Sequence, residues 1–507
     1  MMKHNVMARR SRDFLNRVLA GFLWFVVCAG ANGSVFGNDW SQFRGGSQQG
    51  KIQRDDPVKS LADNHLVWRK EVPSGHSSPV VSQGKVYLTS ASQADQKVTT
   101  HCFSLNNGEM LWQASESVEK WASIHPFNSQ ATPTCCCDDE GVLSYFGSYG
   151  LIRYSHAGEK IWEVKMPIAK VQYGVSTSPV VLKKRVFLVR DSREGSSLAC
   201  YSLVDGQKFW TTERPLNSTN NSTPLIIPNQ NGTDLIAVNG TPVSHVYDGR
   251  TGKPVFWNAG YPFEAISVPL WIGDKIVFSN RGTGSPGDPL FVPSFKDLMK
   301  RFADADQKGI ATDRIPSSEM LVLRPEVEIG GSGRELGLVR LVKGFMDQDK
   351  NGLVTLEEYN TMNDKLSSNR NKMASVSLDQ KLQVEDSELD WIGTKGVPEM
   401  ANPIEVGGKI FTIEDGGIYN LIDFKSGRHL TKGRIRARGR YTASPVCWNG
   451  LVYLISSAGN WSILTISGNE IKTEEKGALG ERVFATPAPT KKGLVVRTEK
   501  SLRLYRD

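Results

Sequence analysis

The sequence predicts an all-β protein, an eight-bladed β-propeller of four-stranded blades with a small α-helical insertion in blade 5. One observation is a tryptophan that follows a turn glycine by four or five residues in the first four units. Another is a blade start ending in proline, which recurs 42 to 54 residues apart except for one interval of 134 residues. Repeats of this length are typical of propellers. The starts are Ser78-Pro79, Thr132-Pro133, Ser178-Pro179, Thr223-Pro224, Val268-Pro269, Asn402-Pro403, Ser444-Pro445 and Thr486-Pro487.

The first unit shows how one blade is built. A strand begins after Pro79, and a glycine-containing turn leads to a second strand through the apolar residues 86–88. The third strand contains Cys102, and the Asn107-Gly108 turn connects it to a fourth strand that ends at Trp112. An Asn-Gly dipeptide between two strand-like runs is a strong hairpin signal, so the unit is predicted to be one antiparallel sheet.

The two ends of the chain are predicted to complete one blade together. The last unit, residues 484–506, stops at its third strand, Ser501-Leu-Arg-Leu-Tyr505. The segment Leu66 to Trp68 precedes the first full unit and reads as an additional strand. We expect it to be the missing outer strand of blade 8, because this pairing removes two exposed sheet edges.

The N-terminal residues 1–37 have the pattern of a secretory signal peptide. A basic start precedes an apolar run from Val18 to Ala29, and small residues precede Asn38. The run is shorter than the roughly 20 residues that a membrane span needs. Cys28 follows a poor lipoprotein motif, so a soluble exported form is favoured over a lipid anchor. The mature chain is therefore expected to have no transmembrane segment and to reside in the periplasm or cell envelope.

Charge argues against a nucleic-acid partner. The formal net charge is +8, and half of it comes from residues 1–37. The remaining excess is small, and no nucleic-acid recognition motif is present. One basic strip alternates along the chain at Lys432, Arg434, Arg436, Arg438 and Arg440. It is either an anion-binding surface or, the favoured interpretation, an outer strand whose cations prevent edge pairing.

The long interval interrupts blade 5 and divides the chain into four parts. Residues 1–37 are the signal peptide, 38–281 hold blades 1 to 5, 282–387 are the insertion, and 388–507 complete blades 5 to 8. Within the insertion the hydrophobic period changes from two to 3.6, which predicts helices at residues 295–302 and 338–345.

The second predicted helix runs directly into a complete twelve-residue calcium loop. Oxygen donors stand at positions 1, 3, 5, 7, 9 and 12, and Gly352 provides the sharp turn at position 6. Three carboxylates with neutral oxygens suit a hard divalent ion such as calcium. The predicted ligands are Asp347, Asp349, Asn351, Leu353 through its carbonyl, Thr355 and Glu358.

A second stretch resembles this loop but lacks essential donors. Asp304, Asp306 and Gly309 match the start of the motif, whereas Lys308 and Ile315 stand where ligands are required. We interpret residues 304–315 as a partner loop that has lost its ion.

Six cysteines remain outside the predicted signal peptide. Cys102, Cys135, Cys200 and Cys447 occupy repeated blade positions, which favours buried packing. The run Cys135-Cys136-Cys137 leaves two alternatives open, free thiols or a strained bond between neighbours.

The blade unit, with its Ser-Pro-Val-Val start, Gly-Lys-Val-Tyr strand and Gly-Glu-x-x-Trp end, resembles the pyrroloquinoline quinone (PQQ)-like repeat family, and within it the BamB-like propellers. The insertion resembles an EF-hand pair. Apart from the insertion near residues 282–387, the PQQ-like resemblance covers nearly all of residues 40–507. The family includes both quinoprotein dehydrogenases and propellers without cofactor, and we favour an exported binding or scaffold protein with a calcium-binding EF-hand and an envelope protein or polymer as partner. The alternative is a divergent PQQ-dependent dehydrogenase of the periplasm.

The residues of the chain do not favour the dehydrogenase alternative. A quinoprotein needs a funnel site for the cofactor and a carboxylate base. The complete calcium loop lies in the insertion, not on blade strands, and the cysteine run fits the family's cysteine pair poorly. We nominate no catalytic residue, leave the cofactor-binding residues unassigned, and expect calcium, but not PQQ, as a cofactor.

Overall fold

The computed structural model describes residues 40–54, 56–217, 219–229, 232–262, 264–282, 293–322, 335–338, 342–347, 349–361, 370–437 and 439–507. The expected signal peptide and Cys28 lie outside these residues. No helix among the described residues is long and apolar enough to cross a membrane.

Eight four-stranded antiparallel blades follow one another, which confirms the predicted propeller. Blades 1 and 2 are β3 (Val80–Ser82), β4 (Lys85–Ser92), β5 (Lys97–Ser104) and β6 (Met110–Ser117), then β7 (Cys136–Cys137), β8 (Gly141–Phe146), β9 (Gly150–Ser155) and β10 (Lys160–Lys165). Blades 3 and 4 are β11 (Val180–Leu182), β12 (Arg185–Arg190), β13 (Ser197–Ser202) and β14 (Lys208–Glu213), then β15 (Leu225–Ile227), β16 (Leu235–Val238), β17 (Val243–Asp248) and β18 (Pro254–Ala259).

The later blades have the same order. Blades 5 and 6 are β19 (Leu270–Ile272), β20 (Lys275–Asn280), β25 (Lys372–Ser377) and β27 (Trp391–Gly393), then β28 (Ile404–Val406), β29 (Lys409–Glu414), β30 (Ile418–Asp423) and β31 (His429–Arg434). Blades 7 and 8 are β32 (Val446–Trp448), β33 (Leu451–Ile455), β34 (Asn460–Ser467) and β35 (Glu470–Ala478), then β36 (Ala488–Thr490), β37 (Gly493–Arg497), β38 (Ser501–Tyr505) and β2 (Leu66–Glu71).

Short elements complete the propeller. The strand β26 (Leu382–Gln383) pairs in parallel with β18 and covers the outer edge of blade 4, and β1 (Lys51–Ile52) pairs in parallel with the inner strand β32. Three short 3-10 helices connect strands: η1 (Asp63–His65), η4 (Asp386–Glu388) and η5 (Asp415–Gly417).

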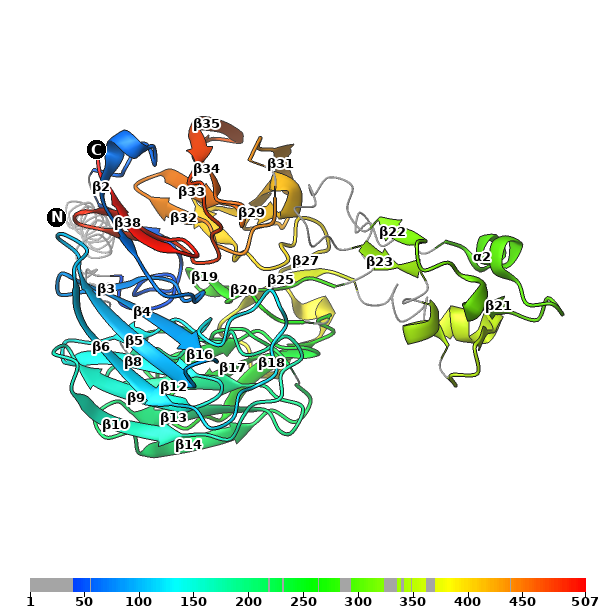
Figure 1. Cartoon of the computed structure of the whole chain (residues 1–507), viewed down its shortest axis with the longest axis horizontal. Coiled ribbons are helices and arrows are strands. Elements are labelled where there is room, and N and C mark those ends of the chain that lie inside the picture. Colours follow the sequence, from blue (N-terminus) through cyan, green and yellow to red (C-terminus); the bar gives the residue numbers. More distant parts are fainter. Residues whose placement is uncertain are drawn as a thin grey trace, which may run out of the picture. The chain divides into compact units, whose positions relative to one another are not determined.

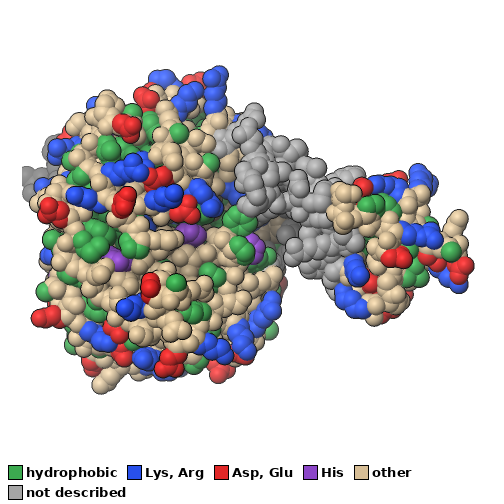
Figure 2. Space-filling model, viewed as in Figure 1, with side chains coloured by type: hydrophobic (Ala, Val, Ile, Leu, Met, Phe, Trp, Pro, Cys, Tyr) green, Lys and Arg blue, Asp and Glu red, His purple; other side chains and the backbone are tan. Residues whose placement is uncertain are grey.

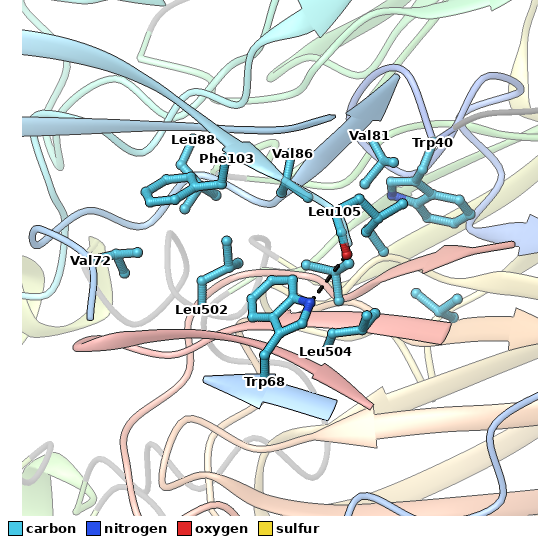
Figure 3. Packing of buried hydrophobic residues seen from close by; sticks show 13 residues of the cluster. Trp40, Trp68, Val72, Val81, Val86, Leu88, Phe103, Leu105, Leu502 and Leu504 are labelled. Atoms are coloured by element: carbon cyan, nitrogen blue, oxygen red, sulfur yellow. Dashed lines mark hydrogen bonds between the residues drawn. The ribbon is translucent and has the colours of Figure 1, made fainter. Parts of the chain in front are cut away.

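The ring closes as the sequence predicts. Strand β2 pairs antiparallel with β38, with Trp68 opposite Leu504, and Figure 1 shows the blue strand beside the red one. The Trp68 indole N–H donates to the Leu105 carbonyl of blade 1 at 3.1 Å (Figure 3). Strand β2 therefore belongs to blade 8 and also contacts blade 1.

The repeated Gly-to-Trp spacing reflects a contact between neighbouring blades. The turn glycine of one blade packs against the outer-strand tryptophan of the blade before it. A Cβ atom at these glycines would lie 2.5 to 2.8 Å from the nearest indole atom, so only glycine fits. The pairs are Gly108 with Trp68, Gly158 with Trp112, Gly206 with Trp162, Gly252 with Trp210, and Gly427 with Trp391.

A relay of hydrogen bonds links the blade starts around the ring. In each link a backbone N–H donates to a side-chain oxygen at the matching position of the next blade. The links run Ser78 to Thr134, Thr134 to Ser178, Ser178 to Thr223, Val268 to Asn402, Asn402 to Ser444, Ser444 to Thr486, and Thr486 back to Ser78. Valine has no acceptor, so the relay is interrupted between Thr223 and Val268. The matching residue of blade 2 is Thr134, not Thr132, and Cys135 occupies the place of the proline.

The start of the described chain, residues 40–52, lies along the inner strands and contacts six of them in sequence. In each case the N–H of the third residue after a relay position donates to this segment. The donors and acceptors are Val81 to Trp40 O, Cys137 to Ser41 O, Val181 to Gln42 Oε1, Ile226 to Gln48 Oε1, Trp271 to Gln49 Oε1, and Cys447 to Gly50 O. We call residues 40–52 the channel segment.

The insertion connects β20 to β25. Its described part contains the helix α2 (Phe295–Phe302), the π-helix η3 (Val342–Met346) and a helical turn at residues 356–361. It also contains β21 (Ile310–Ala311), η2 (Thr312–Arg314), β22 (Met320–Val322), β23 (Glu335–Gly337) and β24 (Leu353–Val354), with β21 paired to β24 and β22 to β23. The third strand of blade 5 begins at Lys372, inside the range 282–387 that the sequence assigns to the insertion. The Gly282 N–H donates to Asn371 Oδ1 at 2.8 Å, which joins the two ends of the insertion.

Candidate functional site

Three of the predicted calcium ligands come together in the insertion. Carboxylate oxygens of Asp347, Asp349 and Glu358 lie within 4.8 Å of one another. Asp347 is buried, and its Oδ1 has no hydrogen-bond partner among the described residues. A buried carboxylate oxygen without a donor is costly, and a cation would satisfy it.

Local hydrogen bonds shape the loop around these carboxylates. Asp347 Oδ2 accepts from the Gly352 N–H at 3.1 Å, and the positive φ of Gly352, 86°, allows the sharp turn. Thr355 and Glu358 bond reciprocally: the Thr355 hydroxyl accepts from the Glu358 N–H and donates to Glu358 Oε2. This contact begins the helical turn at residues 356–361 and holds Glu358 toward the loop.

Two other predicted ligands have partners within the loop. The Asn351 amide donates to Asp349 Oδ2 at 2.7 Å, and its Oδ1 accepts from the Leu353 N–H at 2.7 Å. Leu353 lies in β24, opposite Ala311 of β21. The pairing of β21 with β24 places the two predicted loops side by side.

In the incomplete loop, a lysine ammonium lies beside the carboxylates. Asp304 Oδ1 accepts from the N–H groups of Lys308 and Gly309, at 2.6 and 3.0 Å. The Lys308 ammonium lies 3.2 Å from Asp306 Oδ2. These hydrogen bonds, the Gly309 bond first, lower the pKa of Asp304, although partial desolvation opposes the shift. The lysine occupies a place that a metal ligand would need.

The cysteine run is buried between blades. All six cysteines of the described chain are buried and unpaired. Cys135 and Cys137 belong to the apolar cluster between blades 1 and 2, and Cys136 faces the cluster between blades 2 and 3. Burial raises the pKa of Cys135 to about 12, so its thiol is neutral at physiological pH. The three cysteines of the run therefore pack between blades as neutral thiols.

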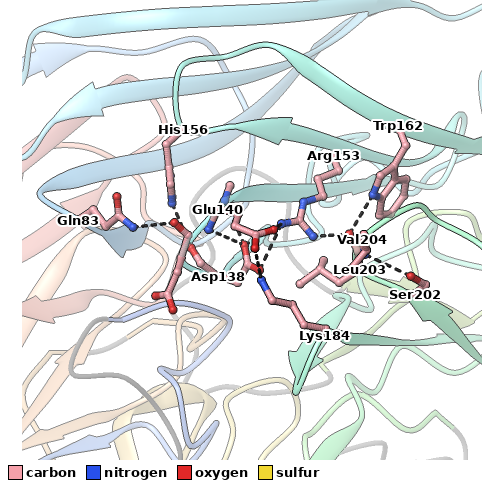
Figure 4. A network of polar contacts seen from close by, with 12 residues as sticks. Gln83, Asp138, Glu140, Arg153, His156, Trp162, Lys184, Ser202, Leu203 and Val204 are labelled. Carbon is pink, nitrogen blue, oxygen red and sulfur yellow. Dashed lines mark hydrogen bonds and ion pairs between the residues drawn. The ribbon is translucent and has the colours of Figure 1, made fainter.

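The charged groups beside this run bind one another. Arg153 is 1 % exposed and pairs with Asp138 at 3.0 Å and Glu140 at 3.2 Å, and Lys184 of blade 3 pairs with both carboxylates (Figure 4). Burial opposes ionisation of Asp138, but the Lys184 hydrogen bond and the Arg153 charge lower its pKa. The network connects blades 2 and 3 and has a structural role.

The basic strip divides between an edge and a loop. Lys432 and Arg434 are exposed on β31, the outer strand of blade 6, which fits edge protection. Arg440 lies over the ring of Phe127, at 4.7 Å from its centroid. Arg438 lies outside the described residues. Figure 2 shows basic and acidic side chains interspersed on the face of the propeller that it presents.

Comparisons with known proteins agree with the architecture. The model of a family described as "Outer membrane protein assembly factor BamB" matches residues 58–223. BamB from Moraxella catarrhalis is 10 % identical, with a TM-score of 0.50 over 87 % of this chain and 98 % of that one. The computationally designed protein Ika8 is 9 % identical, with a TM-score of 0.50 over 87 % and 100 %. No curated protein sequence matches the chain.

The chain is similar to BamB-like propellers. A quinohemoprotein alcohol dehydrogenase, ADHIIG from Pseudomonas putida HK5, is 12 % identical, with a TM-score of 0.49 over 92 % of this chain and 80 % of that one. At these identities the solved structures show the fold alone. The family match adds support for the BamB-like, PQQ-like repeat type.

Sequence reasoning did not identify the contacts of the channel segment with the inner strands. Trp40 and Gln48 are buried, and Arg44 is completely buried. Burial lowers the pKa of Arg44 to about 9, so it remains charged at neutral pH. The available signal was compositional: a tryptophan, a phenylalanine, an arginine and three glutamines stand within ten residues, and the other four residues are glycine or serine.

Proposed function

We propose that the protein is an exported BamB-like propeller that acts as a scaffold for an envelope partner and binds one calcium ion in its EF-hand insertion. The calcium part is supported by the convergence of Asp347, Asp349 and Glu358, whose oxygens lie within 4.8 Å of one another. Such carboxylates repel one another when no ion is present, and a divalent cation relieves the repulsion.

Only one of the two loops supplies this donor set. In the other loop an ammonium stands beside Asp306, and Ile315, which is buried, replaces the last carboxylate. We therefore expect one calcium ion per chain. The paired strands β21 and β24 would transmit order from the calcium loop to its partner.

Isothermal titration of the mature chain with calcium tests this proposal. We expect a stoichiometry of one, and a loss of affinity for Glu358→Gln greater than the roughly 10- to 100-fold cost of an outer-shell change. Asp304→Asn in the incomplete loop is the matched control and should leave calcium binding unchanged. Absence of binding at millimolar calcium, or equal affinity of Glu358→Gln and the parent, would contradict the proposal.

The scaffold part rests on the family match, since the matched family is described as an outer membrane protein assembly factor. We propose an envelope protein as partner rather than a small substrate. Photo-crosslinking in an envelope fraction, followed by purification of the crosslinked protein and a direct affinity measurement, tests this. We expect binding by the parent chain that weakens in calcium chelator.

Titration with PQQ separates the scaffold from the dehydrogenase. The protein has 12 tryptophans, so quenching of their fluorescence reports cofactor binding. Saturable quenching in the micromolar range or tighter, with or without calcium, would refute the scaffold and favour the quinoprotein.

A further inference from the structure

The channel segment contacts the propeller in the manner of a bound peptide. It accepts hydrogen bonds from the same backbone position of blades 1, 2, 3, 4, 5 and 7. Its own strand β1 extends the sheet of blade 7, with Lys51 opposite Cys447. Addition of an extended segment to a sheet edge is a common mode of peptide recognition, in which main-chain bonds supply affinity and side chains supply specificity.

Side chains of the channel segment make specific polar contacts with individual blades. Gln48 is the clearest case, because its amide bonds blade 4 twice, accepting from the Ile226 N–H at 2.9 Å and donating to the Pro224 carbonyl at 2.6 Å. It therefore imitates the backbone of an added strand. Arg44 donates to the Pro403 carbonyl of blade 6 at 2.6 Å, and Lys51 forms an ion pair with Glu405 of the same blade.

Apolar packing and backbone shape add further selectivity. Trp40 is 2 % exposed and joins the cluster between blades 8 and 1, beside Val81 (Figure 3). Gly45 has φ of 84°, and a Cβ there would lie 2.9 Å from the Trp40 ring. Gly50 likewise has a positive φ, of 67°. A ligand for this surface must therefore carry tryptophan, arginine, glycine and glutamine at fixed spacing.

The strand pair that closes the ring lies outside the channel segment. The strand that closes blade 8 is β2, which begins at Leu66, and its pairing partner is β38. The channel segment ends at Ile52, and the intervening residues include exposed positions such as Gln53 and Asp56.

We propose that the inner wall of the propeller is a peptide-binding surface and that the channel segment is its intramolecular ligand, which a peptide of the same pattern can replace. The ligand class is an extended peptide with the pattern of residues 40–50, Trp-Ser-Gln-Phe-Arg-Gly-Gly-Ser-Gln-Gln-Gly. Because the channel segment covers the inner wall, other partners would bind the connecting loops at the rims or the insertion.

Cleavage of the folded full-length chain tests the proposal. A specific protease site replaces residues 53–57, and the protein is cut after folding. We expect the cut segment to remain with the folded ring during gel filtration, and to exchange with an excess of a fluorescent synthetic peptide of residues 38–54. Loss of the segment from a folded ring, or unfolding of the ring on cleavage, would overturn the proposal.

Two variant peptides provide the matched comparison. A Gln48→Ala peptide loses both bonds to blade 4 and should exchange into the ring about tenfold less tightly or weaker. A Gln53→Ala peptide alters an exposed glutamine and should exchange like the parent. Equal exchange of the two peptides would show that the inner wall does not recognise the Gln48 side chain, and would contradict the proposal. A chain lacking residues 38–52 gives a direct binding measurement with the same peptides, and the same ranking is expected.

Discussion

Replacing Thr486 with valine removes one acceptor from the hydrogen-bond relay and leaves the shape of the side chain nearly unchanged. Thr486 Oγ1 accepts from the Ser444 N–H at 3.0 Å, and both residues are 2 % exposed. Water does not replace the lost acceptor at this depth. A buried donor left without a partner costs about 1 to 3 kcal/mol, so we expect Thr486→Val to lower the free energy of unfolding by about 2 kcal/mol.

The interruption of the relay offers the reverse experiment. Val268 is 1 % exposed and stands where the Thr223 N–H would find its acceptor. Val268→Thr supplies the missing oxygen, and a net hydrogen bond contributes about 1 kcal/mol. The two variants exchange the same pair of residue types at matching positions of the ring, so their expected effects have opposite signs.

Urea unfolding followed by tryptophan fluorescence measures both effects. The slope against urea should stay constant, and only the midpoint should move. If Thr486→Val unfolds at the same urea concentration as the parent, the relay does not contribute to stability. If Val268→Thr is destabilised instead, the cost of burying a hydroxyl exceeds the gain from closing the relay.

Three further predictions concern the ring. Gly158→Ala should destabilise the fold by about 3 kcal/mol, because a Cβ would lie 2.8 Å from the Trp112 ring, whereas Gly84→Ala, with open space around it, should cost only about 1 kcal/mol; chemical denaturation compares the two. Burial, together with the charge of Arg497, lowers the pKa of His101 to about 4, so the contribution of this residue to stability should be present above about pH 6.5 and fall by about 2 kcal/mol at pH 5 as the unfolded chain takes up a proton. Burial also lowers the pKa values of His76 and His245, which add to the loss at low pH, so His101→Gln should reduce the loss by about 2 kcal/mol in pH-dependent melting without removing it. Deleting residues 38–72 removes β2 and should unfold the ring cooperatively, and an unchanged melting curve would show that β2 does not close it.

The propeller could be predicted because its repeats combine two local features, a start at each inner strand and a Gly-to-Trp spacing at each outer strand. The sequence places the start of blade 2 two residues too early, because Pro133 matches the proline found at the other starts. The relay uses the oxygen of Thr134, and Cys135 stands where the other blades have proline. Only the hydrogen bonds between blades distinguish these two starts.

The convergence of Asp347, Asp349 and Glu358 was predictable because all three lie in one loop of twelve residues. The channel segment was not, because its partners are distant: Arg44 and Pro403 are 359 residues apart. Its glutamines bond backbone groups of the blades, and backbone groups are the same whichever residues stand there, so the sequence does not show these contacts. Likewise, Lys372–Ser377 is a strand of blade 5 through pairing with β20 across the whole insertion, and no local pattern shows that pairing.

The bond between Gly282 and Asn371 has a consequence for how this chain can be rebuilt. Asn280 pairs with Lys372, so the hairpin is already joined before the insertion begins. Carrying a loop of about 90 residues in place of a short turn costs roughly 3 kcal/mol in closure entropy, since that cost grows only with the logarithm of length. The hairpin of blade 5 is thus a splice point, at which a foreign domain with neighbouring termini can be grafted onto the ring or the native one exchanged.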